Sequence, residues 1–211
     1  MPKTRPAIVF LPPAPHTGAF FDTIRSTLGE VGTLALTYPG YGDQAPIAQS
    51  SIRDYAEALV QDIPKSAVLV GFHTGNLVAA EIAKRKTIAK IVMIDIPYFD
   101  QDTRDAYAAK LPDDPEKDAF RAAFAYDPFT EFSDIPCSVS VIATQSNLLD
   151  PTRNAAKALG VSLTERMDVT APVFEAHAKE MAAEILSAIK LGDEGPDERH
   201  ALLHADYGEN P

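Results

Sequence analysis

The sequence predicts an α/β fold, a three-layer α/β/α domain built on a six-stranded, mostly parallel sheet. Short apolar runs rich in β-branched residues alternate along the chain with longer segments of helical periodicity. This alternation is typical of parallel strands that helices bury on both faces. Right-handed crossovers then connect successive strands. We expect one domain over residues 1–190, followed by a tail.

Six apolar runs are the expected strands: Ala7–Leu11, Thr33–Thr37, Ala67–Gly71, Lys90–Ile94, Ser138–Ala143 and the weaker Ser162–Met167. Segments with apolar residues at helical spacing are the expected helices: Ala19–Leu28, Ile52–Ile63, Thr74–Lys84, Thr103–Lys110, Glu116–Ala125, Thr152–Leu159 and Val173–Ile189. The residues after the second run support its assignment as a strand, because Pro39 and Gly40 predict a turn that ends it.

Two stretches depart from strict alternation. Pro97–Pro136 holds two short helical patterns and no strand, so we interpret it as a short helical lid over one edge of the sheet. Leu191–Pro211 is an acidic C-terminal tail that is either solvated or docked on this chain or a neighbour. Its His200 and His204 are four residues apart and would share one face of a helix. The sequence leaves open whether they return to the functional site.

Composition narrows the choice of partners. Thirty acidic residues against 19 basic ones give a net charge of −11, which argues against nucleic acid or an anionic membrane as a partner. The single Cys137 excludes an intrachain disulfide and fits a reducing compartment. No 18-residue apolar run occurs, and the apolar stretch near the start is short and broken by prolines, so we do not expect a signal peptide. These observations favour a cytoplasmic protein. We also expect a small-molecule partner and no cofactor, with a homodimer as one candidate oligomeric state.

The most informative stretch joins a strand to a helix through a sharp turn. The run Ala67–Gly71 is followed by Phe72, His73, Thr74 and Gly75, a Gly-x-His-x-Gly pattern. Flanking glycines let strand and helix approach closely, while the residue between them is held in strained backbone geometry. Its side chain is then presented at the carboxyl edge of the sheet, where open α/β folds bind ligands.

These residues, with three further stretches in order, resemble the α/β-hydrolase superfamily over about residues 6–190. Leu11–Phe21 is similar to the family's oxyanion loop and its aromatic residue, and Tyr38–Gly42 to its Pro-Gly-x-Gly turn. Gly71–Gly75 is similar to the nucleophile elbow, and Ala182–Ile189 to the closing helix. The resemblance implies a trimmed version of the fold with sheet order 2-1-3-4-5-6.

The sequence departs from the family at two positions of the catalytic triad. His73 stands where the family has its nucleophilic serine. The family's histidine is expected near Val169–Ala171, where none occurs, and we place His177 on the face of the following helix. Serine-triad hydrolysis needs a nucleophile, a base and an orienting acid, so ordinary serine-hydrolase activity is not expected.

The acid position has two candidates after the fifth expected strand. One alignment selects Asn147, and a shift by three residues selects Asp150. We prefer Asn147, because Pro151 then falls where the family often has a proline.

The oxyanion hole is a separate expectation from the resemblance. Its donors are the backbone N–H groups of Thr74 and of Ala14, since the neighbouring prolines carry no N–H. The start of the helix at Thr74 also favours negative charge. A cradle of this kind binds carboxylates, esters or other carbonyl groups.

Three interpretations of His73 remain open: a catalytic base or nucleophile, a ligand contact, or a space-filling residue. Imidazole acts as a base near neutral pH, and the helix dipole would lower its pKa. His16 is either a pocket residue opposite His73 or a solvent-exposed loop residue. Phe72 and Tyr38 are expected in the pocket wall. A metal site formed by the two histidines with Asp150 or Asp95 lacks supporting spacing.

Two functions follow. The first is an atypical hydrolase that acts on a small ester, acyl or carbonyl substrate, with His73 as the base and Ala14 and Thr74 as oxyanion donors. The second is a catalytically inactive member that binds a small ligand or a protein partner in the same pocket. The fold alone does not decide between them.

Overall fold

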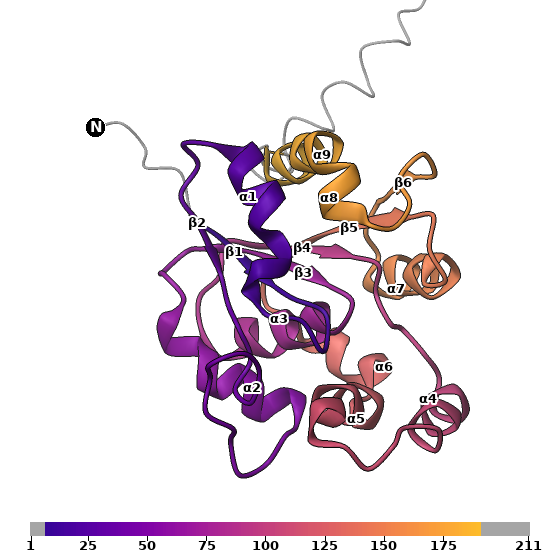
Figure 1. Cartoon of the computed structure of the whole chain (residues 1–211). Coiled ribbons are helices and arrows are strands. Elements are labelled where there is room, and N and C mark those ends of the chain that lie inside the picture. Colours follow the sequence, from indigo (N-terminus) through magenta and orange to yellow (C-terminus); the bar gives the residue numbers. More distant parts are fainter. Residues whose placement is uncertain (1–6, 191–211) are drawn as a thin grey trace, which may run out of the picture.

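The computed structural model describes residues 7–190 of the chain (Figure 1). The tail predicted for Leu191–Pro211, with His200 and His204, lies outside it. The expected three-layer α/β/α architecture is confirmed, because helices cover both faces of one six-stranded sheet.

The sheet has the predicted order, β2-β1-β3-β4-β5-β6. All strand pairs are parallel, so the sheet is fully rather than mostly parallel. The strands are β1 (Ile8–Leu11), β2 (Thr33–Ala35), β3 (Val68–Phe72), β4 (Lys90–Ile94), β5 (Ser138–Thr144) and β6 (Leu163–Arg166). In a parallel sheet the carboxyl ends of all strands lie at one edge, and the candidate site is formed there.

The helices divide between the two faces. One face carries α1 (Asp22–Leu28), α8 (Val173–Ala176) and α9 (Ala178–Lys190), which lie above the sheet in Figure 1. The opposite face carries α2 (Ile52–Leu59), α3 (Thr74–Arg85), α5 (Asp118–Ala125) and α7 (Leu149–Leu159). Figure 1 also places α4 (Gln101–Ala108) and the single turn α6 (Pro128–Glu131) on this side.

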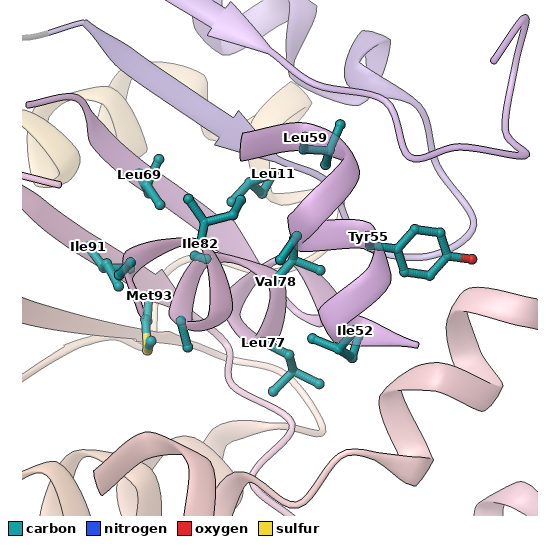
Figure 2. Close-up of a cluster of buried hydrophobic side chains, with 14 of the residues drawn as sticks. Leu11, Ile52, Tyr55, Leu59, Leu69, Leu77, Val78, Ile82, Ile91 and Met93 are labelled. Atoms are coloured by element: carbon teal, nitrogen blue, oxygen red, sulfur yellow. The ribbon is translucent and has the colours of Figure 1, made fainter. Parts of the chain in front are cut away.

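Each face of the sheet has its own hydrophobic core. Alternate side chains of a strand point to opposite faces, so Leu69 packs toward α3 while Val68 and Val70 pack toward α1 and α9. Figure 2 shows the α3 side, where Leu69 and Ile91 of the strands lie near Ile82 of the helix. Strands buried on both faces explain why the apolar runs in the sequence are continuous.

Two helical expectations need correction. The expected helix Val173–Ile189 is broken at His177 (φ −120°, ψ 30°), which separates α8 from α9. The helix expected over Ala19–Leu28 begins as a 3-10 turn, Gly18–Phe21, before α1. None of the described helices is long and apolar enough to cross a membrane.

A buried ionic cluster attaches the segment 97–136 to α3. The Glu81 carboxylate is 2% exposed and accepts hydrogen bonds from Lys84 (2.8 Å), Arg85 (2.6 Å) and the Tyr126 hydroxyl (2.9 Å). Lys84 also donates to Glu131 of α6 at 2.6 Å. Because these partners satisfy a buried charge, the cluster ties α3 to the segment 97–136 on the same face of the sheet.

Candidate functional site

The chain turns sharply at the end of β3, and His73 is the residue at the turn. Its backbone has φ 49° and ψ −116°, and α3 begins at the next residue, Thr74. The His73 N–H donates to the Ile94 carbonyl at 3.2 Å, which holds the turn against the end of β4. A positive φ is costly for a residue with a side chain, so the surrounding packing must impose it.

The two glycines beside the turn, Gly71 and Gly75, stand where there is no room for a Cβ atom. A Cβ on Gly75 would lie 2.1 Å from the Leu11 carbonyl oxygen, and one on Gly71 would lie 2.7 Å from the Asn76 nitrogen. No side chain larger than hydrogen fits without separating α3 from the strands. The Gly-x-His-x-Gly pattern is therefore a packing requirement of this strand–turn–helix unit.

A cavity of about 300 Å³ opens beside His73 at the carboxyl edge of the sheet. Its wall comes from the loop after β1, the turn at His73, the ends of β4 and β5, and the region around α8. The lining residues are Pro13, Ala14, His16, Phe20, Phe72, His73, Asp95, Ser146, Ala171, Pro172, Val173, Phe174 and Glu175. The volume is at the small end of ligand pockets, and the mixture of apolar wall and few polar groups is typical of them.

Burial makes His73 a neutral imidazole. Burial lowers the pKa of His73 from 6.5 to about 4; the charge of Asp95 opposes this shift and His16 adds to it. The ring stacks on Phe72 with centroids 3.9 Å apart. Its Nε2 atom is buried and has no hydrogen-bond partner among residues 7–190. A buried polar atom without a partner is a site where a ligand or water can gain a hydrogen bond.

Asp95 is the carboxylate that the structure brings beside His73. It directly follows β4, is completely buried and lies in the cavity wall. Its Oδ1 accepts from the Thr144 N–H at 2.8 Å and its Oδ2 from the Thr144 hydroxyl at 2.6 Å. From the sequence, Asp95 was a candidate only for a metal site. An aspartate directly after a buried strand is the signal that would have found it.

The two acid candidates from the sequence lie elsewhere. Asn147 and Asp150 are exposed and are not in the cavity wall, although their neighbour Ser146 is. The Asp150 side chain is 84% exposed and pairs with Arg153 of the same helix at 3.0 Å. The first turn of α7 carries Asp150 to the surface, so neither residue contacts His73.

The loop after β1 brings Ala14 and His16 into the cavity wall, together with Phe72. His16 is exposed and packs on Phe20 with centroids 4.8 Å apart. Within the described range, the backbone N–H groups of Ala14 and Thr74 donate to no other protein group. Ala14 lines the cavity, whereas Thr74 is buried at 4% exposure and is not among the lining residues.

Tyr38 and His177, in contrast, serve the framework. Tyr38 was expected in the pocket wall, but it is fully buried and its hydroxyl donates to the Pro12 carbonyl at 2.6 Å. Burial raises the pKa of Tyr38 well above its usual range. His177 is half-buried at the break between α8 and α9, and its Nε2 accepts from the Thr170 N–H at 3.4 Å. Neither residue lines the cavity.

Two further expectations concern the surroundings of the site. No residue of the segment 97–136 lines the cavity, so the interpretation of this segment as a lid stays a prediction. Among the described residues, no group of three or more His, Cys, Asp or Glu side chains is arranged to hold a metal ion.

Comparison with known proteins identifies the architecture. The model of the alpha/beta hydrolase family matches residues 8–185. This chain belongs to the alpha/beta hydrolase family. A search of curated proteins finds no significant match.

Solved structures of alpha/beta hydrolases share the fold. A lipase-esterase related protein from Clostridium acetobutylicum superposes with a TM-score of 0.72 at 16% identity, covering 88% of this chain and 95% of that one. MenH from S. aureus gives 0.70 at 14% identity, covering 91% and 96%. An esterase from Exiguobacterium antarcticum gives 0.71 at 15% identity, covering 88% and 92%. At such identities the likeness concerns the fold alone.

Proposed function

We propose that this alpha/beta hydrolase hydrolyses a small ester or acyl compound without a serine nucleophile, using His73 as a general base. The observation that carries the proposal is the position of the His73 imidazole. It occupies a turn with a strained backbone, at the wall of a cavity, and its Nε2 has no hydrogen-bond partner among residues 7–190. Strained residues of this kind are concentrated at functional sites.

The carbonyl oxygen of the substrate would accept hydrogen bonds from the Ala14 and Thr74 N–H groups. Neither N–H donates to another group of residues 7–190, and Thr74 begins the 12-residue helix α3, whose dipole favours negative charge. Donors aimed at the oxygen stabilise the charge that develops on it as the carbonyl carbon becomes tetrahedral.

His73 would take a proton from water while the water oxygen attacks the carbonyl carbon. The imidazolium then returns this proton to the leaving oxygen as the carbon–oxygen bond breaks, so ester and water become acid and alcohol. Because the pKa of His73 is about 4, the imidazole is unprotonated at neutral pH and ready to accept. Turnover should therefore be flat from about pH 6 to 8 and fall as the pH drops through about 4.

Hydrolysis of short p-nitrophenyl esters by the wild type and by His73→Ala tests the proposal. We expect turnover above background in the wild type and a loss of at least tenfold in kcat/KM in the variant, with the matched control His177→Ala unchanged. Equal, background-level turnover in both proteins would exclude ester hydrolysis at this site.

A catalytically inactive, ligand-binding protein is the second candidate. What favours it is that no hydroxyl or thiol stands at residue 73 and that His177 is held in the framework by Thr170. A small neutral carbonyl compound that binds the wild type, loses affinity in His73→Ala and is never turned over would support this reading. For either function we propose a small-molecule partner and a cytoplasmic location, the latter supported by the single Cys137.

A further inference from the structure

We propose that Asp95 is a positioning residue for His73: its carboxylate, held by Thr144, stabilises the imidazolium that forms when His73 takes a proton from water. This inference rests on the proposed function of His73 and extends it to a second residue. In the expected triad this role belongs to Asn147 or Asp150.

Strand register brings the two residues together. β3 and β4 are neighbours, and Phe72 pairs with Ile94, so His73 and Asp95 are the next residues on adjacent parallel strands. Neighbouring strands lie about 5 Å apart. Both residues have a φ of 49°, and the His73 N–H donates to the carbonyl of Ile94, which directly precedes Asp95. The backbone therefore turns at the ends of both β3 and β4, at the edge of the cavity.

The third strand in the row holds the carboxylate in place. β5 is the neighbour of β4, and Thr144 is its last residue. Thr144 donates to each Asp95 oxygen, from its backbone N–H and from its hydroxyl. The Asp95 N–H itself donates to the Ile142 carbonyl at 3.1 Å. Two hydrogen bonds to different oxygens leave the carboxyl group little rotational freedom.

The carboxylate is also a buried charge without a cation. It is 0% exposed, and no Lys or Arg of residues 7–190 forms an ion pair with it. Hydrogen bonds from Thr144 compensate only part of the cost of burying a charge. A positive charge that appears on the neighbouring imidazole during the reaction would supply the missing counter-charge.

The other charged groups at the cavity act differently. Among the charged groups of residues 7–190 that line the cavity, Asp95 raises the pKa of His73, whereas burial and His16 lower it. Glu175 of α8 belongs to the wall but is exposed, so water screens its charge. Among residues 7–190, no Lys or Arg lines this cavity. Asp95 is thus the group placed to assist the base.

The substitution Asp95→Asn separates charge from structure. The amide oxygen can still accept from the Thr144 N–H, and the amide nitrogen can donate to the Thr144 hydroxyl. We expect kcat for ester hydrolysis to fall at least tenfold, KM to change less than twofold, and the acid limb of the pH profile to move to lower pH. Asp150→Asn is the matched control and should leave all three quantities unchanged.

An NMR titration of the His73 ring in the full chain provides a readout that needs no turnover. Its pKa should be lower in Asp95→Asn than in the wild type. Where Asp95→Asn does not fold, Thr144→Val keeps the charge but removes one bond to it, and kcat should fall about threefold at constant KM. No change in kcat in Thr144→Val would overturn the proposal.

Failure of the proposed hydrolysis and failure of the proposed role of Asp95 give different results. Absence of turnover in the wild type removes the proposed hydrolysis, and with it the role of Asp95 in the reaction. An identical His73 pKa in the wild type and a folded Asp95→Asn removes the electrostatic coupling, even if the ester is hydrolysed.

Discussion

The side chain of Asn76 forms hydrogen bonds with both the backbone carbonyl and the backbone N–H of Ile94. Its amide nitrogen donates to the Ile94 carbonyl at 2.8 Å, and its oxygen accepts from the Ile94 N–H at 3.1 Å. Asn76 lies in the first turn of α3 and is completely buried, so this pair fastens the helix after His73 to the strand before Asp95. The two residues of the proposed site therefore depend on a buried amide three residues beyond the turn.

We expect Asn76→Leu to destabilise the fold by about 2–3 kcal/mol. Leucine has a similar size but leaves the Ile94 N–H buried without a partner, which costs about 1–3 kcal/mol. Urea unfolding measures the loss, with the exposed Asn154→Ala of α7 as the control. A loss below about 0.5 kcal/mol, the range of ordinary surface substitutions, would contradict this account.

Gly75→Ala is expected to be more damaging than a substitution at a glycine in open space. The new Cβ would meet the Leu11 carbonyl at 2.1 Å, whereas a Cβ on Gly32 meets nothing within 4 Å. Overpacking of this kind costs about 1–3 kcal/mol or more, because backbone must move. Thermal unfolding of Gly75→Ala and the control Gly32→Ala makes the comparison. Similar melting temperatures would mean that α3 is free to shift away from β1.

The Glu81 cluster should make stability depend on acidity in a defined window. Burial alone would raise the pKa of Glu81, but hydrogen bonds from Lys84, Arg85 and Tyr126 lower it from 4.5 to about 2. A carboxylate with a depressed pKa stabilises the fold above its unfolded pKa, and this contribution is lost as the pH falls from about 4.5 to about 2. At about 1.4 kcal/mol per pKa unit, the full contribution is about 3 kcal/mol.

Urea titrations at pH 7 and pH 3 test this window. The wild type should lose more stability between these two values than Glu81→Gln, in which the titrating group is absent. The control is Glu180→Gln, an exposed residue of α9 that should behave like the wild type. An equal loss of unfolding free energy between pH 7 and pH 3 in the wild type and in Glu81→Gln would mean that other groups cause the acid sensitivity.

Fluorophosphonate probes should not label the turn between β3 and α3. These reagents need an activated hydroxyl, and the apex residue here is His73, while the side chain of Thr74 is buried at 4% exposure. Mass spectrometry of the peptide spanning residues 71–75 checks this after incubation with excess probe. A phosphonate on Thr74 would replace His73 as the centre of the proposed site.

The sequence alone determined the parts of this protein that local patterns encode. Continuous apolar runs predicted the strands, and the Gly-x-His-x-Gly pattern placed His73 between a strand and a helix, because side-chain periodicity and glycine spacing are properties of neighbouring residues. The resemblance carried by four such stretches was enough to predict the strand order that the sheet has.

Only the tertiary structure decided which residues accompany His73. Asp95 and Thr144 lie 22 and 71 positions further along the chain, yet the register of β3, β4 and β5 brings them to one edge. Alignment with the family's acid position favoured Asn147 or Asp150, but the first turn of α7 directs Asp150 to solvent. Tyr38 likewise turned inward to bind Pro12. Strand pairing, an interaction between distant segments, determines these neighbours, and the spacing of residues within one segment does not encode it.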